Sequence, residues 1–414
     1  MTAQPLDSFD PAIRRRALQE VCSTGNWPAP TDWINLHSHT FYSYNAYGYS
    51  PTHFAVLARE RGLALAGIVD FDVLDAVDEF YDTCRQVGLK GVASIESRVF
   101  VPEFATRVIN SPGEPGIAYH MGVGFPRAIR HPFLDGMRAS AITRNRELVA
   151  RVNAFTAPVT LDYDRDVLPL IPAGNATERH ICEAYSKKGD AAFWKSKLGD
   201  CPADSAKLQA LIRSKTMKQG GVGYVQPSKD SFPLMADMNR FVTEAGAIPT
   251  LAWLDGTSDG EKCMDELFAT GASAINIIPD RNYTPGVKDQ KLQNLYDIVA
   301  LAEKHHFPII VGTEMNAPGN KFVDDFNTAE LTPLLPVFLR GAHIVYGHTV
   351  LQRQAGLGYL SEWAKKNFLT VAAKNAFFEE LGRQLQPQHE DRLAGLTKDT
   401  KPETVISCTR TSNA

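Results

Sequence analysis

Residues 34–40 read INLHSHT, an apolar stretch that ends in His37 and His39. Such a run predicts a β-strand, and residues i and i+2 of a strand point to the same side of a sheet. Both imidazole rings can therefore reach one metal ion at the strand end. The alternative is a pair of core or surface histidines that happen to alternate.

Six further apolar runs have the composition of strands, and helix-length amphipathic stretches separate most of them. This alternation is typical of βα units, which build parallel sheets and barrels. One predicted helix starts at Pro51 and ends near Gly62, because proline suits a first helical turn and glycine a C-terminal cap. The predicted strands cover residues 33–36, 65–69, 91–101, 118–125, 247–253, 272–278 and 307–313.

One segment of about a hundred residues interrupts this alternation, because it is helical in pattern and has few strand-like runs. We interpret it as an inserted helical subdomain. The predicted organisation is a first part of a barrel at 1–131, the insertion at 132–232, a second part of the barrel with C-terminal helices at 233–385, and a polar tail at 386–414.

Composition narrows the class of protein. The chain has 414 residues, of which 44% are hydrophobic and 22% charged, the balance of an ordinary enzyme with a large core. The net charge of −4 without a dense Lys/Arg stripe predicts no nucleic-acid partner. The six cysteines form no CxxC pair, which favours reduced thiols. Neither a signal-peptide core nor an apolar run of about 18 residues is present, so we expect a cytoplasmic protein without a membrane partner.

Further candidate metal ligands stand in or at the end of other predicted strands. Barrel enzymes place their chemistry at the carboxyl ends of strands, so residues from several strands can meet there. Glu96, His120 and Glu314 lie in such positions and join His37 and His39 as predicted ligands. A single strand-end carboxylate is equally explained as a helix cap or turn residue. Five convergent residues indicate one metal site.

Other polar residues are candidates for binding an anionic small molecule or for moving a proton. Arg98 is two residues after Glu96 and should face the same side of the strand. Arg281, Asn282 and Lys321 are predicted in loops just past strand ends, where a solvated surface side chain is the alternative for each. His348 is a candidate general acid, and a buried structural histidine is at least as good an interpretation.

Three segments resemble the polymerase and histidinol phosphatase (PHP) superfamily: NLHSHTFYSYNAYGYSP at 35–51, LAGIVDFD at 65–72 and GVASIES at 91–97. Members open with an HxH strand and continue with a TDH-type motif and a Glu-bearing strand. The resemblance implies an α/β fold, a distorted (β/α)7 TIM-like barrel, and metal-dependent hydrolysis of phosphate esters. It extends over about residues 33–125 and 232–326.

On this resemblance, His37 and His39 match the opening pair, Glu96 the bridging carboxylate and His120 a later ligand. Glu314 takes the place of an aspartate in the final motif. Residues without strong metal affinity replace other family ligands at Asn45, Phe71, Trp253 and Asn316. The remaining set implies one divalent ion, and two imidazoles with carboxylates suit zinc, manganese or iron.

Three functions stay open at this point. The first is a metal-dependent hydrolase of a small phosphate ester that uses metal-activated water, with Glu96, Glu314 and His348 as catalytic residues. The second is a single-metal lyase or isomerase that acts on a hydroxylated or carboxylated small molecule. The third is a non-catalytic relic that binds a ligand. The expected partner is a small anionic substrate, and a homo-oligomer is left open.

Overall fold

The computed structural model describes residues 5–283 and 289–410. Seven strands form one sheet in the order β1 to β7, each at a predicted strand position. A parallel bridge between Ser38 and Glu314 connects the two edges, so the sheet curls into a nearly closed barrel. The strands are β1 Ile34–Ser38, β2 Leu65–Phe71, β3 Lys90–Phe100, β4 Ile117–Val123, β5 Ile248–Trp253, β6 Ala274–Ile277 and β7 Ile309–Val311.

One strand departs from the parallel arrangement. β4 pairs antiparallel with both β3 and β5, whereas all other neighbouring strands pair in parallel. The carboxyl end of β4 therefore lies at the opposite rim of the barrel from the carboxyl ends of the other six strands. This reversal decides where several predicted site residues lie.

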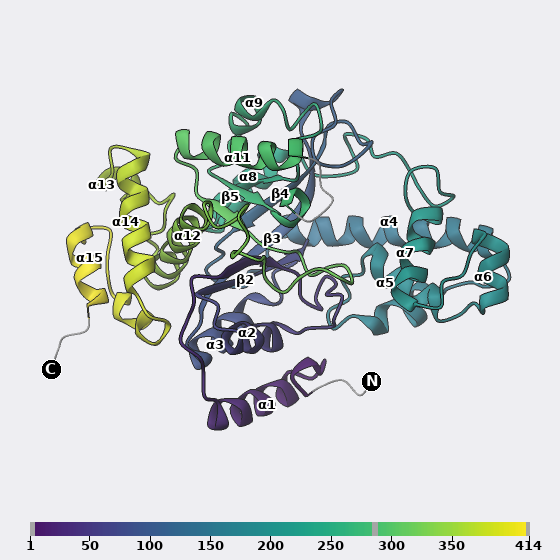
Figure 1. Cartoon of the computed structure of the whole chain (residues 1–414), viewed down its shortest axis with the longest axis horizontal. Coiled ribbons are helices and arrows are strands. Elements are labelled where there is room, and N and C mark those ends of the chain that lie inside the picture. The colour runs from purple at the N-terminus through teal and green to yellow at the C-terminus, as the bar shows by residue number, and fades with distance from the viewer. Residues whose placement is uncertain (1–4, 284–288, 411–414) are drawn as a thin grey trace.

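Helices cover the outside of the barrel (Figure 1). All residues of β1, β5, β6 and β7 are buried, as expected for a sheet covered on both faces. The Ser50 hydroxyl caps α2 by accepting the N–H of His53, and Gly62 follows this helix with a φ of 69°. The helices around the barrel are α1 Pro11–Thr24, α2 Pro51–Glu60, α3 Val77–Val87, α8 Met235–Glu244, α9 Met264–Phe268, α10 Asp280–Tyr283, α11 Asp289–Lys304 and α12 Leu335–Ala355.

The segment at 132–232 is helical, as predicted, and lies on one side of the molecule (Figure 1). Its helices are α4 Pro132–Thr156, α5 Glu178–Ser186, α6 Ala191–Leu198 and α7 Ser205–Thr216, with short turns η3 Tyr163–Val167 and η4 Leu168–Leu170. They share a hydrophobic cluster separate from that of the barrel, which includes Tyr185, Trp194 and Ile212. The predicted domain boundaries stay a prediction.

The C-terminal segment lies on the side opposite the insertion and contains α13 Glu362–Asn367, α14 Val371–Gln384, η5 Pro387–Leu393 and α15 Pro402–Thr409 (Figure 1). The region predicted as a polar tail is folded, since Leu393 and Val405 are buried in the main core. Two further short helices are η1 Pro5–Asp7 and η2 Pro102–Phe104. None of the helices described has the length and apolar character needed to cross a membrane.

Candidate metal centre

Three buried side chains meet at the barrel mouth and form the candidate metal centre: His37 of β1, His39 just after β1, and Glu96 of β3. Their ligand atoms lie within 4.8 Å of one another. Glu96 Oε2 is 3.2 Å from His39 Nε2 and 4.0 Å from His37 Nε2. Two imidazoles and a carboxylate form a donor set typical of zinc and other transition metals. Three of the five predicted ligands are thus together.

A hydrogen bond fixes the ring of His37. Its Nδ1 lies 3.0 Å from Asn276 Oδ1 on β6, and an amide oxygen only accepts, so Nδ1 carries the proton and donates. Nε2 is buried without a hydrogen-bond partner among the described residues. Burial lowers the pKa of His37, although Glu96 opposes this shift. His37 is therefore in the neutral form that binds metals.

A relay of two residues fixes the ring of His39. Ser43 Oγ donates to Asp70 Oδ1 at 2.7 Å, and it lies 3.0 Å from His39 Nδ1. The hydroxyl proton points to Asp70, so Ser43 Oγ accepts from His39 Nδ1–H. Asp70 also accepts from the N–H and hydroxyl of Thr40. The relay leaves His39 Nε2 facing Glu96.

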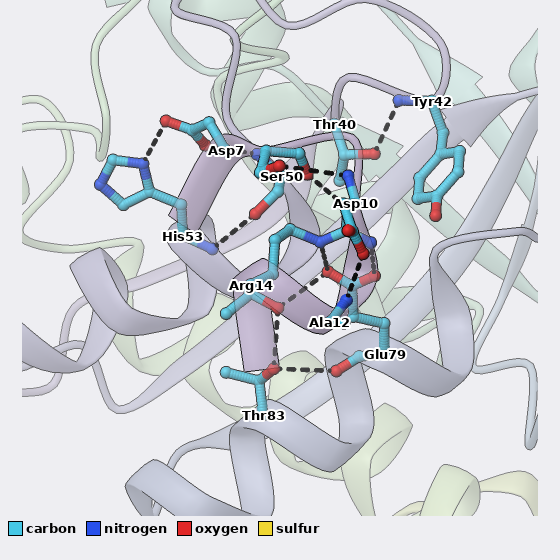
Figure 2. A network of polar contacts seen from close by, with 12 residues as sticks. Asp7, Asp10, Ala12, Arg14, Thr40, Tyr42, Ser50, His53, Glu79 and Thr83 are labelled. Atoms are coloured by element: carbon cyan, nitrogen blue, oxygen red, sulfur yellow. Dashed lines mark hydrogen bonds and ion pairs between the residues drawn. The ribbon is translucent and has the colours of Figure 1, made fainter. Parts of the chain in front are cut away.

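The N-terminal segment holds the loop that follows His39 (Figure 2). The N–H of Ser50 donates to Asp7 Oδ1 at 2.8 Å. Arg14 of α1, only 2% exposed, donates from Nε to Glu79 of α3 at 2.8 Å, and its guanidinium lies 5.2 Å from the centre of the Phe41 ring. Residues outside the barrel therefore fix the loop that carries Ser43.

Glu314 follows β7 and closes the barrel beside the two histidines. It has a φ of 64°, its N–H donates to His37 O at 2.8 Å, and its carbonyl accepts the N–H of His39 at 2.9 Å. Its carboxylate pairs with Arg281 at 2.9 Å. Although burial opposes the shift, Arg281 and the two histidines hold the pKa of Glu314 below its ordinary value. Glu314 lies next to the candidate metal centre but outside its 4.8 Å group.

The placement predicted for His120 is wrong, because β4 is antiparallel. Tyr119 lies directly opposite Arg98, and residues paired across antiparallel strands share a face. His120 therefore points away from the barrel interior, where its Nε2 bonds to Asn239 Oδ1 of α8 at 2.6 Å. Burial lowers the pKa of His120 to about 4. This residue contributes to packing between the sheet and α8.

His348 is also far from the predicted site. On α12, its Nδ1 accepts the N–H of Tyr359 at 2.9 Å, so Nε2 carries the proton and donates to Gly124 O at 3.2 Å. Gly124 follows β4, whose carboxyl end is at the rim opposite the candidate metal centre. The predicted role of His348 as a general acid is therefore wrong, and it is a structural histidine.

Two of the four predicted substrate-binding residues line a cavity of about 330 Å³ beside the candidate metal centre. Arg98 and Arg281 reach this cavity, and Arg98 is paired with Glu114. Asn282 is buried and donates to a main-chain carbonyl of α11 at 2.7 Å. Lys321 pairs with a carboxylate of α10 at 2.8 Å. Neither of these two is among the residues that line the cavity.

Four cationic side chains of the cavity come from the insertion, and sequence analysis did not single them out. Charged residues on helices are usually solvated, so their pattern carries no signal of a site. The structure places the insertion over the barrel mouth at this cavity. The four are Arg144 of α4, Arg179 of α5, Arg213 of α7 and Lys218 just after α7.

The residues that the sequence resemblance aligns with ligand positions have other roles here. Asn45 donates to His39 O at 2.8 Å and accepts the N–H of Tyr47, so its amide holds the loop. Trp253 is buried on β5. Phe71 and Asn316 line the cavity.

Comparisons with known proteins identify the fold and no family. No protein-family model and no curated protein matches this chain. An amidohydrolase from Chromobacterium violaceum, with bound sulfate and no metal, has a TM-score of 0.52 and 18% identity over 74% of this chain and 96% of its own. A candidate metal-dependent phosphoesterase from Bifidobacterium adolescentis has a TM-score of 0.51 and 17% identity over 75% and 96%. At these identities the likeness supports the predicted barrel-like α/β fold alone.

Proposed function

We propose that this protein is a metal-dependent hydrolase of the PHP type that cleaves a small phosphate ester with water. One observation carries the proposal: His37 Nε2 and His39 Nε2 are buried, have no hydrogen-bond partner among the residues that the structure describes, and converge on Glu96 Oε2. A buried polar atom without a partner costs about 1–3 kcal/mol. A cation that accepts both lone pairs removes this cost.

We infer a single ion of zinc, manganese or iron, with Glu314 as the fourth protein ligand. Its main chain bonds to both histidine residues, which holds Glu314 beside the candidate metal centre. The side chains of Phe71 and Trp253 cannot bind a metal, and the Asn45 amide is already used by the loop. These replacements support one ion over a cluster.

The chain's own residues would assist hydrolysis in distinct ways. A bound divalent ion supplies an activated water and neutralises charge at phosphorus. The carboxylates of Glu96 and Glu314 can accept the proton of the attacking water. Arg281 and Arg98 line the same cavity and can stabilise the negative charge that develops on the phosphoryl oxygens. Phe71 contributes an apolar wall that limits the access of bulk water.

Metal analysis with a hydrolysis assay tests the proposal. We expect about one equivalent of zinc, manganese or iron in the purified protein, together with hydrolysis of p-nitrophenyl phosphate. His39→Ala should lose both. His305→Ala is the matched control, because His305 is partly exposed and pairs with Asp265 outside the cavity. Unchanged metal content in His39→Ala contradicts the proposal, and metal without ester hydrolysis favours a lyase or isomerase.

A further inference from the structure

The cavity beside the candidate metal centre has more cationic than acidic side chains. Its acidic lining residues are Asp72, Glu96, Glu178 and Glu314. Its cationic lining residues are Arg98, Arg144, Arg179, Arg213, Lys218 and Arg281. A concave surface with an excess of one charge concentrates small ions of the opposite charge, so this cavity should attract anions.

Four of the cationic side chains already have a carboxylate partner. Arg98 and Arg281 pair with the glutamates described above. Arg213 Nε and Lys218 Nζ share one carboxylate, with Glu178 Oε2 at 2.9 Å and 2.7 Å. The first two pairs lie within the barrel and the other two within the insertion, so a carboxylate already partly balances each of these four charges.

Arg144 has no carboxylate within 4.0 Å among the residues that the structure describes. Its Nη1 donates to Ser231 O at 3.2 Å, and its guanidinium lies 4.8 Å from the centre of the Phe232 ring. Arg98 contacts the same ring at 4.3 Å. Burial lowers the pKa of Arg144, and the charge of Arg98 adds to this shift although Asp72 opposes it. Two like charges therefore share one aromatic ring, and the carboxylate of Asp72 acts on Arg144 only from beyond ion-pair distance.

Arg179 is the second cationic residue without a carboxylate partner in the described part of the chain. It lies in the first turn of α5, where Thr177 caps the helix, and its side chain faces the cavity. Burial lowers the pKa of Arg179, and the neighbouring Arg213 contributes. A partly buried guanidinium without a counter-ion is costly, and a bound anion relieves that cost.

We propose that Arg144 and Arg179 form an anion subsite that binds a second oxyanion group of the substrate, separate from the group held at the candidate metal centre. The inference rests on the proposed function and names its substrate class: a small phosphate ester that carries an additional phosphate or carboxylate. Guanidinium groups bind either oxyanion in a bidentate manner. In this arrangement the barrel supplies the chemistry and the insertion selects the substrate.

Calorimetric titration of metal-free protein with inorganic phosphate and with succinate tests the subsite. We expect at least one of them to bind, and Arg144→Gln and Arg179→Gln each to weaken that binding about 10- to 100-fold through loss of a charge-assisted contact. Arg146→Gln is the matched control, since Arg146 is on the same helix, 49% exposed, and pairs with Asp164 outside the cavity. Unchanged affinity in both cavity variants, or no binding of either anion to the wild type, overturns the inference.

The titration needs neither metal nor turnover, so its outcome is independent of the proposed function. With metal-loaded protein, Arg179→Gln should raise KM about 10- to 100-fold for an ester with a second anionic group and leave KM unchanged for an ester without one. Equal effects on both esters overturn the specificity role. Arg179→Lys keeps the charge and should restore part of the discrimination. Thermal unfolding confirms that each variant is folded.

Discussion

The relay from Asp70 through Ser43 to His39 can be tested by one substitution, Ser43→Ala. Ser43 Oγ lies 2.7 Å from Asp70 Oδ1 and 3.0 Å from His39 Nδ1. The substitution leaves the buried Nδ1–H without an acceptor. The imidazole can then move its proton to Nε2, the atom that faces Glu96, and a protonated nitrogen cannot bind a metal.

Two independent arguments give the size of the effect. An unsatisfied buried donor costs about 1–3 kcal/mol. Loss of a partner that orients a metal-binding histidine typically lowers metal affinity about 10- to 100-fold, which corresponds to about 1.4–2.7 kcal/mol. We therefore expect the Kd for zinc or manganese to rise about 10- to 100-fold in Ser43→Ala. The stoichiometry should stay the same, because His37 and Glu96 keep their positions.

A competition titration against a chromogenic chelator measures this change. Ser94→Ala is the matched control, because Ser94 is a buried hydroxyl two residues before Glu96 with no hydrogen-bond partner in the described chain. The control should bind metal like the wild type. If Ser43→Ala also binds metal like the wild type while His39→Ala does not bind, the relay does not set the tautomer and the reasoning is refuted.

Three further predictions concern stability. Burial, with Asp280 adding, raises the pKa of Asp324 to about 7, so the folded state keeps a proton that the unfolded state loses above pH 4. The contribution of Asp324 to the free energy of unfolding of the wild type therefore falls as the pH rises from 4 to 7. At pH 8 the free energy of unfolding of Asp324→Asn, measured by urea unfolding, should exceed that of the wild type by roughly 2–4 kcal/mol, with little difference at pH 4. Arg14→Ala breaks the buried pair with Glu79 and should lower the free energy of unfolding by about 3–5 kcal/mol in the same assay. His348→Ala loses two hydrogen bonds to the backbone and should cost about 2–4 kcal/mol while metal content stays unchanged.

Exposed neighbours provide the controls for these substitutions. Asp325→Asn and Arg15→Ala change the same charges at exposed positions and should alter stability little. A pH-independent difference between Asp324→Asn and the wild type would show that the Asp324 carboxyl does not titrate near pH 7. Loss of bound metal in His348→Ala would place this residue in the site after all.

The strands were predictable because apolar runs of strand length mark buried segments whatever their neighbours are. The antiparallel direction of β4 was not predicted, although the segment between β3 and β4 indicates it. Parallel neighbours need a crossover of a dozen or more residues that usually forms a helix. Residues 101–116, between β3 and β4, contain only the short turn η2. A prediction that weighed the lack of a crossover helix would have reversed β4 and excluded His120.

Part of the candidate metal centre could be predicted, because it depends only on local sequence and strand order. His37 and His39 are two positions apart, and Glu96 lies on a neighbouring part of the sheet, so local sequence and strand order suffice. Arg144 and Arg179 could not be predicted. Their place depends on how the insertion packs over the barrel mouth, and no local pattern encodes that packing.

The reversal of β4 also explains why one wall of the cavity carries none of the candidate metal ligands. Strands that run in the common direction bring their carboxyl ends to the mouth, and the loop after β7 delivers Glu314 there. β4 instead brings its amino end and the preceding loop, so Tyr119 and Asn110 line the cavity. Asn110 accepts the N–H of Tyr119 at 2.7 Å and donates to Ala252 O at 2.6 Å, which holds this wall against β5. This wall carries the ring of Tyr119, the register partner of Arg98, and in the proposed function it would contact the substrate and not the metal.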